Sequence, residues 1–133
     1  MNSQAEHHYP SLEMQQCMLR CHECHDLCVT TAQHCLQMGG KHAASRHINL
    51  LLDCSQICQT SEDFMLRNSS LHMRVCGVCA EVCERCAQDC QRLDANDTQM
   101  QACAEACRRC AESCYRMAQQ MPTPAEIFAK TSV

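Results

Sequence analysis

The sequence predicts an all-α fold: an antiparallel up-down-up-down four-helix bundle with a cysteine-lined core. All sixteen cysteines of the 133-residue chain fall in four stretches, where they recur at gaps of three, four or seven residues. This spacing is that of the a and d positions, with which a helix faces its partners in a bundle. The breaks between the stretches are short, and short loops make neighbouring helices antiparallel. With two Phe, two Tyr and no Trp, the core has to be filled by small apolar groups such as the neutral thiol.

The first helix is predicted over residues 11–38. Ser11 is a suitable N-cap, Pro10 precedes it, and Gly39 and Gly40 end the helix. The inward positions are Met14, Cys17, Cys21, Cys24, Cys28, Thr31, Cys35 and Met38.

The second and third helices are predicted over residues 42–67 and 71–93, with residues 68–70 (Asn-Ser-Ser) forming the turn and offering an N-cap between them. The inward positions of the second helix are His47, Leu51, Cys54, Cys58, Ser61 and Met65. The inward positions of the third helix are His72, Cys76, Cys79, Cys83, Cys86, Cys90 and Leu93.

The last helix is predicted over residues 97–120, with Asn96 or Asp97 as its N-cap. Its inward positions are Met100, Cys103, Cys107, Cys110, Cys114, Met117 and Met121. Two prolines then end the helix and leave a short C-terminal tail, 121–133. The length suits one domain that covers residues 1–133.

Cysteines on consecutive helical turns predict a site for thiophilic metal ions. Residues four apart on a helix have Cβ atoms about 5–6 Å apart on one face, so two sulfurs can hold one ion between them. Soft thiolate ligands select Cu(I), which accepts two or three sulfurs. We therefore expect multiple Cu(I) ions per chain, bound by Cys17, Cys21, Cys24, Cys28, Cys35, Cys54, Cys58, Cys76, Cys79, Cys83, Cys86, Cys90, Cys103, Cys107, Cys110 and Cys114.

Methionine and histidine occupy the ends of the inward stripes and are candidate ligands there. Antiparallel packing places Met14, Met65, His72, Met117 and Met121 near one end of the bundle. It places Met38, His47 and Met100 near the other, together with two leucines. The first end lacks leucine and is richer in sulfur and imidazole, so we expect it to admit the metal.

The repeated CxxxC and CxxC spacings from about Ser11 to Gln120 resemble those of the bacterial copper storage proteins. Residues 1–16 have no basic start, apolar run or small-residue cleavage site, which resembles the cytosolic branch of that family. The resemblance implies a bundle that binds many Cu(I) ions through core cysteines and assembles as a homotetramer. Cytosolic members carry histidines at a bundle mouth beside the turn before the last helix. Here that turn, 94–97, has no histidine.

Composition and charge favour a cytoplasmic protein without nucleic-acid or membrane partners. No stretch approaches the roughly 20 apolar residues of a membrane span. The net charge of −4 is spread along the chain without a basic stripe. In a reducing compartment, many cysteines suggest metal rather than crosslinks. No paired carboxylates, Ser/His/Asp set or phosphate loop lies on the inward positions, so we expect a metal store and not an enzyme.

Two alternatives remain open: zinc or another thiophilic ion in sites of four cysteines, and a scaffold crosslinked by disulfides. A CxxCH haem-attachment pattern at residues 21–25 is set aside, because both of its cysteines fit the inward stripe. His22 and His25 fall off that stripe, so we expect them on the surface or facing another subunit.

Overall fold

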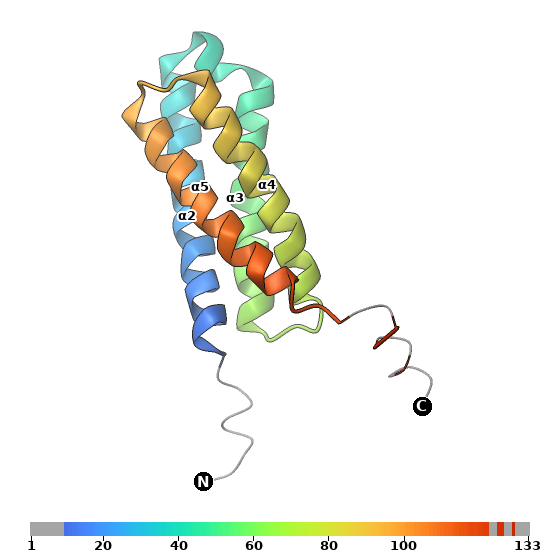
Figure 1. The fold of residues 1–133 in the computed structure, drawn as a ribbon. Helices are drawn as coiled ribbons and strands as arrows, with labels where there is room; N and C mark the ends of the chain where they lie inside the picture. Colours follow the sequence, from blue (N-terminus) through green and yellow to red (C-terminus); the bar gives the residue numbers. More distant parts are fainter. Residues whose placement is uncertain (1–9, 123–124, 127–128, 130–133) are drawn as a thin grey trace.

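The computed structural model describes residues 10–122, 125–126 and 129. Within them the chain forms long α-helices, one short 3₁₀ helix and no strand, which confirms the predicted all-α four-helix bundle (Figure 1). The elements are α2 (Leu12–Met38), η1 (Gly40–Ala43), α3 (Ser45–Leu66), α4 (His72–Leu93) and α5 (Thr98–Ala118). None of the helices in the described ranges has the length and apolar character that crossing a membrane requires.

The helices form a closed ring of neighbours around one core. α2 packs against α3 and α5, and α4 packs against the same two helices. Figure 1 shows successive helices running up and down the bundle. We call the end with η1 and the α4–α5 loop the η1 end. The opposite end, where α2 begins and α5 finishes, is the termini end. Helices of 21 to 27 residues give the core a length of about 32 to 40 Å.

The helix ends follow local sequence signals at three of the predicted positions. The Ser11 hydroxyl accepts a hydrogen bond from the Met14 N–H at 3.1 Å, and Asp97 Oδ1 accepts one from the Met100 N–H at 3.0 Å. Gly39 ends α2 with φ +72°, a left-handed conformation that favours glycine. These caps fix where α2 begins and ends and where α5 begins.

Two helix starts differ from the sequence prediction. α3 begins at Ser45 and not at residue 42, because two glycines with positive φ reverse the chain into η1. The 68–70 turn supplies no side-chain cap to α4, whose N-cap residue is Leu71. The Ser69 hydroxyl instead accepts a hydrogen bond from the Leu71 N–H within the turn. α3 thus starts three residues, and α4 one residue, inside the predicted bounds.

The core is built from thiols. Every cysteine is at most 1% exposed, and small alanines such as Ala32, Ala87 and Ala104 fill the spaces beside them. The a/d pattern therefore placed all sixteen cysteines correctly in the interior. Met38 is a correction: its side chain is 53% exposed. The chain reverses just after it, and His42 of η1, which is buried, closes this end of the core instead.

Candidate metal centre

The sulfur atoms form a connected chain along most of the bundle. From the termini end, Sγ–Sγ contacts of 3.5–3.8 Å join Cys17, Cys114, Cys21, Cys110, Cys58, Cys83, Cys54, Cys24, Cys107, Cys28 and Cys103 in that order. Most of these contacts cross between helices. All sixteen cysteines are free thiols, since a disulfide would bring two sulfurs to about 2.05 Å. The core is thus a continuous column of unbonded sulfur.

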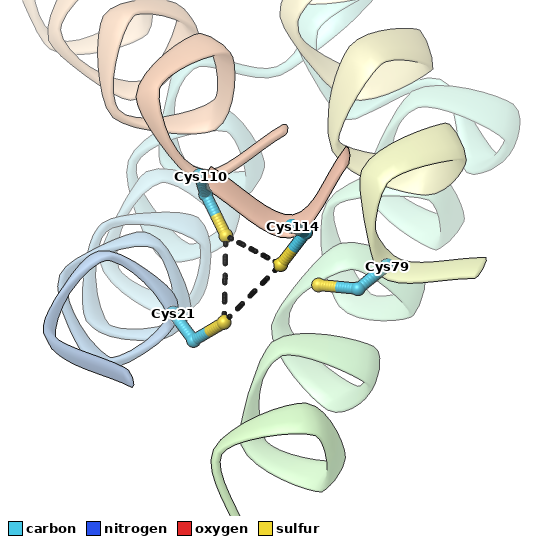
Figure 2. Close-up of side chains that lie close together, drawn as sticks. All are labelled: Cys21, Cys79, Cys110 and Cys114. Atoms are coloured by element: carbon cyan, nitrogen blue, oxygen red, sulfur yellow. Dashed lines mark hydrogen bonds between the residues drawn. The ribbon is translucent and has the colours of Figure 1, made fainter. Parts of the chain in front are cut away.

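Groups of four sulfurs lie close enough to surround single ions. Figure 2 shows one, with Cys21 of α2, Cys79 of α4, and Cys110 and Cys114 of α5 turned toward a common point. All donor atoms within each group lie within 4.8 Å of one another. The other four-sulfur groups are Cys24, Cys28, Cys54 and Cys107; Cys24, Cys54, Cys58 and Cys83; and Cys58, Cys79, Cys83 and Cys110.

These groups share sulfurs. The groups cannot all be filled by separate ions that each take four sulfurs, because six cysteines each belong to two of them: Cys24, Cys54, Cys58, Cys79, Cys83 and Cys110. A sulfur that bridges two Cu(I) ions meets this geometry, because Cu(I) is satisfied by two or three thiolates. The shared positions therefore favour a cluster of copper ions over a set of isolated tetrahedral sites.

Sulfur–sulfur contacts within one helix occur at the predicted CxxxC spacing, but the shortest contacts lie between helices. Three of the seven CxxxC pairs lie at 3.8–4.0 Å: Cys24/Cys28, Cys79/Cys83 and Cys110/Cys114. Contacts between helices are as short as 3.5 Å, for example between Cys58 and Cys83. Each ion would therefore draw ligands from at least two helices.

Thiol acidity is uneven along the column. Hydrogen bonds from the Cys110 and Cys114 thiols lower the pKa of Cys21 to about 6, because they stabilise its thiolate. Burial raises the pKa of Cys35 to about 11, and the nearby Asp97 carboxylate adds to the shift. The Cys58 pKa is also raised, first of all by its hydrogen bond to Cys110. When each Cu(I) ion that binds displaces one thiol proton, loading adds no net charge to the core.

A mixed nitrogen–sulfur arrangement lies at the η1 end. The Nε2 atom of His47 is 3.4 Å from the Cys35 sulfur, and its Nδ1 atom is 2.6 Å from Asp89 Oδ2. The imidazole is 4% exposed. A carboxylate on one ring nitrogen orients the other toward a metal, so His47 is held as a donor beside Cys35. Met100 is fully buried at this same end.

At the termini end, Met65 and Met117 are at most 2% exposed and Met14 is 9% exposed. His72 is half-buried, and its Nδ1–H donates to the Ser69 carbonyl at 2.7 Å. Met121 lies beyond the end of α5, in a turn closed by its N–H donating to the Ala118 carbonyl. The predicted cluster of end residues is thus brought to one end, with three of its methionines buried and the other two residues at the margin.

Sequence periodicity did not identify the carboxylates that hold the histidines. Asp89, Asp94 and Asp97 accept hydrogen bonds from His47, His42 and His34 respectively. None of these aspartates lies on an inward stripe, and each pairs with a histidine from a different segment: α3 for Asp89, η1 for Asp94 and α2 for Asp97. The closeness of Asp89 to Cys90 in the sequence is the one signal that could have pointed to it.

Comparison with protein families gives a match over most of the chain. Residues 11–119 match the family model described as copper storage protein. A comparison with curated proteins found no match.

Solved structures with this fold include several copper-binding proteins. A crystal structure from Nitrosospira multiformis is 42% identical, covers 82% of this chain and 97% of its own, and superposes with a TM-score of 0.76. The Cu(I)-bound copper storage protein BsCsp3 is 33% identical over 80% of this chain and 98% of its own, with a TM-score of 0.74. A Streptomyces lividans copper storage protein loaded with 10 copper equivalents is 25% identical, covers 85% of this chain and 94% of its own, and has a TM-score of 0.77. A Streptomyces lividans copper storage protein is described as cytosolic.

Proposed function

Because the chain belongs to the copper storage protein family and stores many Cu(I) ions in its thiol-lined core, we propose that all sixteen cysteines are its copper ligands. The observation that carries the proposal is the column of sulfurs, in which eleven cysteines from Cys17 to Cys103 have neighbouring Sγ atoms 3.5–3.8 Å apart, while the other five are buried in the same core. A thiolate in such a column can bridge two ions, so the column provides a continuous row of sites.

Zinc in four-sulfur sites is the second candidate. The four-sulfur groups are favourable to it, because zinc takes four thiolates in a tetrahedron. Against it stand the six shared sulfurs, each of which would have to serve two zinc sites if every group were filled: Cys24, Cys54, Cys58, Cys79, Cys83 and Cys110. Copper uses the shared positions without conflict, so copper is the preferred cargo.

Isolation of the protein from copper-supplemented cells tests the proposal. Anaerobic purification followed by elemental analysis should give several copper ions per chain and little zinc. The comparison is a variant with Cys24, Cys54, Cys58 and Cys83 replaced by serine, which removes one four-sulfur group, takes two sulfurs from each of two others and leaves the other twelve cysteines. It should carry less copper than the native chain. Zinc as the dominant metal, or equal copper in both proteins, would overturn the assignment.

The proposal extends to the location, assembly and role of the protein. We place it in the cytoplasm, as a homotetramer without catalytic activity. Support for the location comes from the cytosolic Streptomyces lividans protein. Support for an assembly comes from apolar side chains left on the outer surface of the bundle, such as Val78 at 54% and Tyr115 at 59% exposed. Since one chain has a mass of 15.0 kDa, sedimentation should give 4 × 15.0 = 60 kDa, and a mass of one or two chains would exclude the tetramer.

The termini end is the proposed entrance for copper. Its support is the set of thioether and imidazole donors at this end, with buried Met117 three residues and buried Met65 seven residues beyond the last cysteine of its helix. Thioethers are soft ligands for Cu(I), and methionine is flexible enough to follow a moving ion. Metal would pass from these donors to Cys17, Cys76 and Cys114, whose sulfurs lie within 4.8 Å of one another.

A further inference from the structure

A cluster without sulfur lies at the η1 end, outside the thiol column. It comprises His34 of α2, His42 of η1, and Asp94 and Asp97 of the loop between α4 and α5. His34 Nε2 lies 2.7 Å from Asp97 Oδ2. His42 Nε2 lies 3.0 Å from Asp94 Oδ2 and 4.0 Å from Asp97 Oδ2. Three separate segments therefore bring two imidazoles and two carboxylates to one place.

The carboxylates are held so that one oxygen of each faces the imidazoles. Asp94 Oδ1 accepts a hydrogen bond from the Asn96 N–H at 3.1 Å. Asp97 Oδ1 accepts one from the Met100 N–H at 3.0 Å, as the cap of α5. The remaining Oδ2 atoms are the ones that contact the histidines. The side chains of Asp97 and His42 are only 7% and 9% exposed, and those of Asp94 and His34 are 24% and 32% exposed.

The spacing of these donors suits one small divalent ion. Zinc binds nitrogen and oxygen at about 2.0–2.2 Å, which separates the donors of a tetrahedral site by about 3.3 Å. The three histidine–aspartate contacts in the cluster have nitrogen–oxygen distances of 2.7, 3.0 and 4.0 Å, which bracket this value. Imidazole and carboxylate donors suit Zn(II) and Cu(II), whereas thiolates select Cu(I).

We infer that His34, His42, Asp94 and Asp97 form a second metal site, for a divalent ion of the zinc type, that is chemically distinct from the Cu(I) column. An ion bound there joins α2, η1 and the α4–α5 loop through coordinate bonds, at the end of the core that contains Cys35 and His47. Protein stability and metal content would thus depend on a second ion that copper loading alone does not supply.

A second pair of histidines provides a matched comparison within the same chain. His22 and His25 of α2 contact Asp26, and His22 also contacts Glu62 of α3. The His22 and Asp26 side chains are 55% and 59% exposed, and the two His22 contacts use opposite nitrogens of one ring. On average, these two imidazoles and the Asp26 carboxylate are more exposed than the donors of the cluster at the η1 end. They therefore serve as the control for adventitious zinc binding.

Calorimetric titration of the Cu(I)-loaded protein with Zn(II) tests the site, because Cu(I) occupies the thiols beforehand. The native protein should bind one Zn(II) per chain, with its copper content unchanged by elemental analysis. His34→Ala/His42→Ala should weaken that binding about tenfold or more. His22→Ala/His25→Ala should leave it unchanged. No zinc binding by the native protein, or loss of binding only in the His22/His25 variant, would overturn the inference.

A third variant decides the matter if the His34/His42 variant does not fold. In Asp94→Asn the side-chain oxygen still accepts from the Asn96 N–H, so the loop is retained while the negative ligand is lost. Helix content by circular dichroism should match that of the native protein, and zinc binding should weaken about tenfold or more. Native zinc affinity in this folded variant would show that the cluster is a set of ion pairs and not a metal site.

Discussion

The Sγ atoms of Cys58 and Cys83 lie 3.5 Å apart, across the interface between α3 and α4. Cys83 also lies 3.6 Å from Cys54, 3.8 Å from Cys79 and 4.0 Å from Cys24. Its thiol thus faces sulfurs from α2, from α3 and from its own helix. A side chain in this position can bridge ions held by different helices, so the copper cluster should depend strongly on Cys83.

Replacing Cys83 should therefore lower the copper capacity more than replacing a cysteine at the edge of the column. Cys83→Ala should lose about two Cu(I) ions, since a bridging thiolate serves two ions. Cys35→Ala is the matched control, because Cys35 is buried equally but contacts His47; it should lose about one ion or fewer. Anaerobic Cu(I) titration of both variants measures the difference. Equal losses would argue against a bridged cluster.

The entrance proposal predicts a change in rate without a change in capacity. Met65→Ala/His72→Ala should fill to nearly the native level but load from a Cu(I) donor at a different rate. Residues at the end of the column act as transient ligands, whereas the final sites are built from thiols. Stopped-flow loading and removal by a strong chelator would measure both directions.

His47→Ala is the control for this experiment, because His47 lies at the opposite end, beside Cys35. If His47→Ala slows loading and the Met65/His72 variant does not, copper enters at the η1 end. If neither variant changes the rate, the end residues do not guide the ion, and only the thiol column remains as the functional unit.

Thiol counting tests whether the core is held by metal or by crosslinks. Protein isolated from cytosol and freed of metal under reducing conditions should show nearly sixteen reactive thiols in denaturant. The structure agrees with free thiols at all sixteen positions. Several thiols that appear only after added reductant, in freshly isolated protein, would favour the disulfide scaffold.

Asp97 should make the stability of the metal-free protein sensitive to acid. Its hydrogen bond with His34 and the Met100 N–H hold the pKa of the carboxyl below its ordinary value. A group with a depressed folded-state pKa stabilises the fold above its unfolded pKa, about 3.9, and this stability is lost as the pH falls through the folded value. Urea unfolding from pH 7 down to about pH 2 should show this loss.

Two substitutions separate the charge of Asp97 from its role as a cap. Asp97→Asn keeps an oxygen acceptor for the Met100 N–H but not the charge, so its unfolding free energy should vary less over the acidic range. Asp97→Ala also removes the cap and should lose about 1 kcal/mol at neutral pH. An Asn variant with the native acid profile would show that other groups control the pH dependence.

The spacing of the cysteines was enough to predict the bundle and the inward direction of all sixteen thiols, because burial repeats every three or four residues along a helix. The same rule placed His47 and Met100 inside correctly. It failed at Met38, where Gly39 ends α2 and the chain reverses. Periodicity describes a helix that continues, so it cannot anticipate which residue covers the end of the core.

The histidine–carboxylate pairs could not be predicted for a related reason. His34 and Asp97 are 63 residues apart in sequence and meet at 2.7 Å, because α2 packs against α5, whose N-cap is Asp97. Likewise, spacing predicted ligand pairs within helices, but the shortest path along the column runs mainly between helices, as from Cys24 to Cys107 at 3.6 Å. Helix rotation and relative height set these contacts, and neither is encoded in one stretch alone.

Anaerobic titration of the reduced, metal-free protein with Cu(I) tests the central claim most directly, with a parallel titration by Zn(II) and elemental analysis at each plateau. Sixteen bridging cysteines should take up roughly one Cu(I) each, whereas zinc in the thiol core should stop near one ion for every four cysteines. Copper capacity well above zinc capacity is the expected result. A plateau near four ions per chain for both metals would contradict a thiolate-bridged copper store.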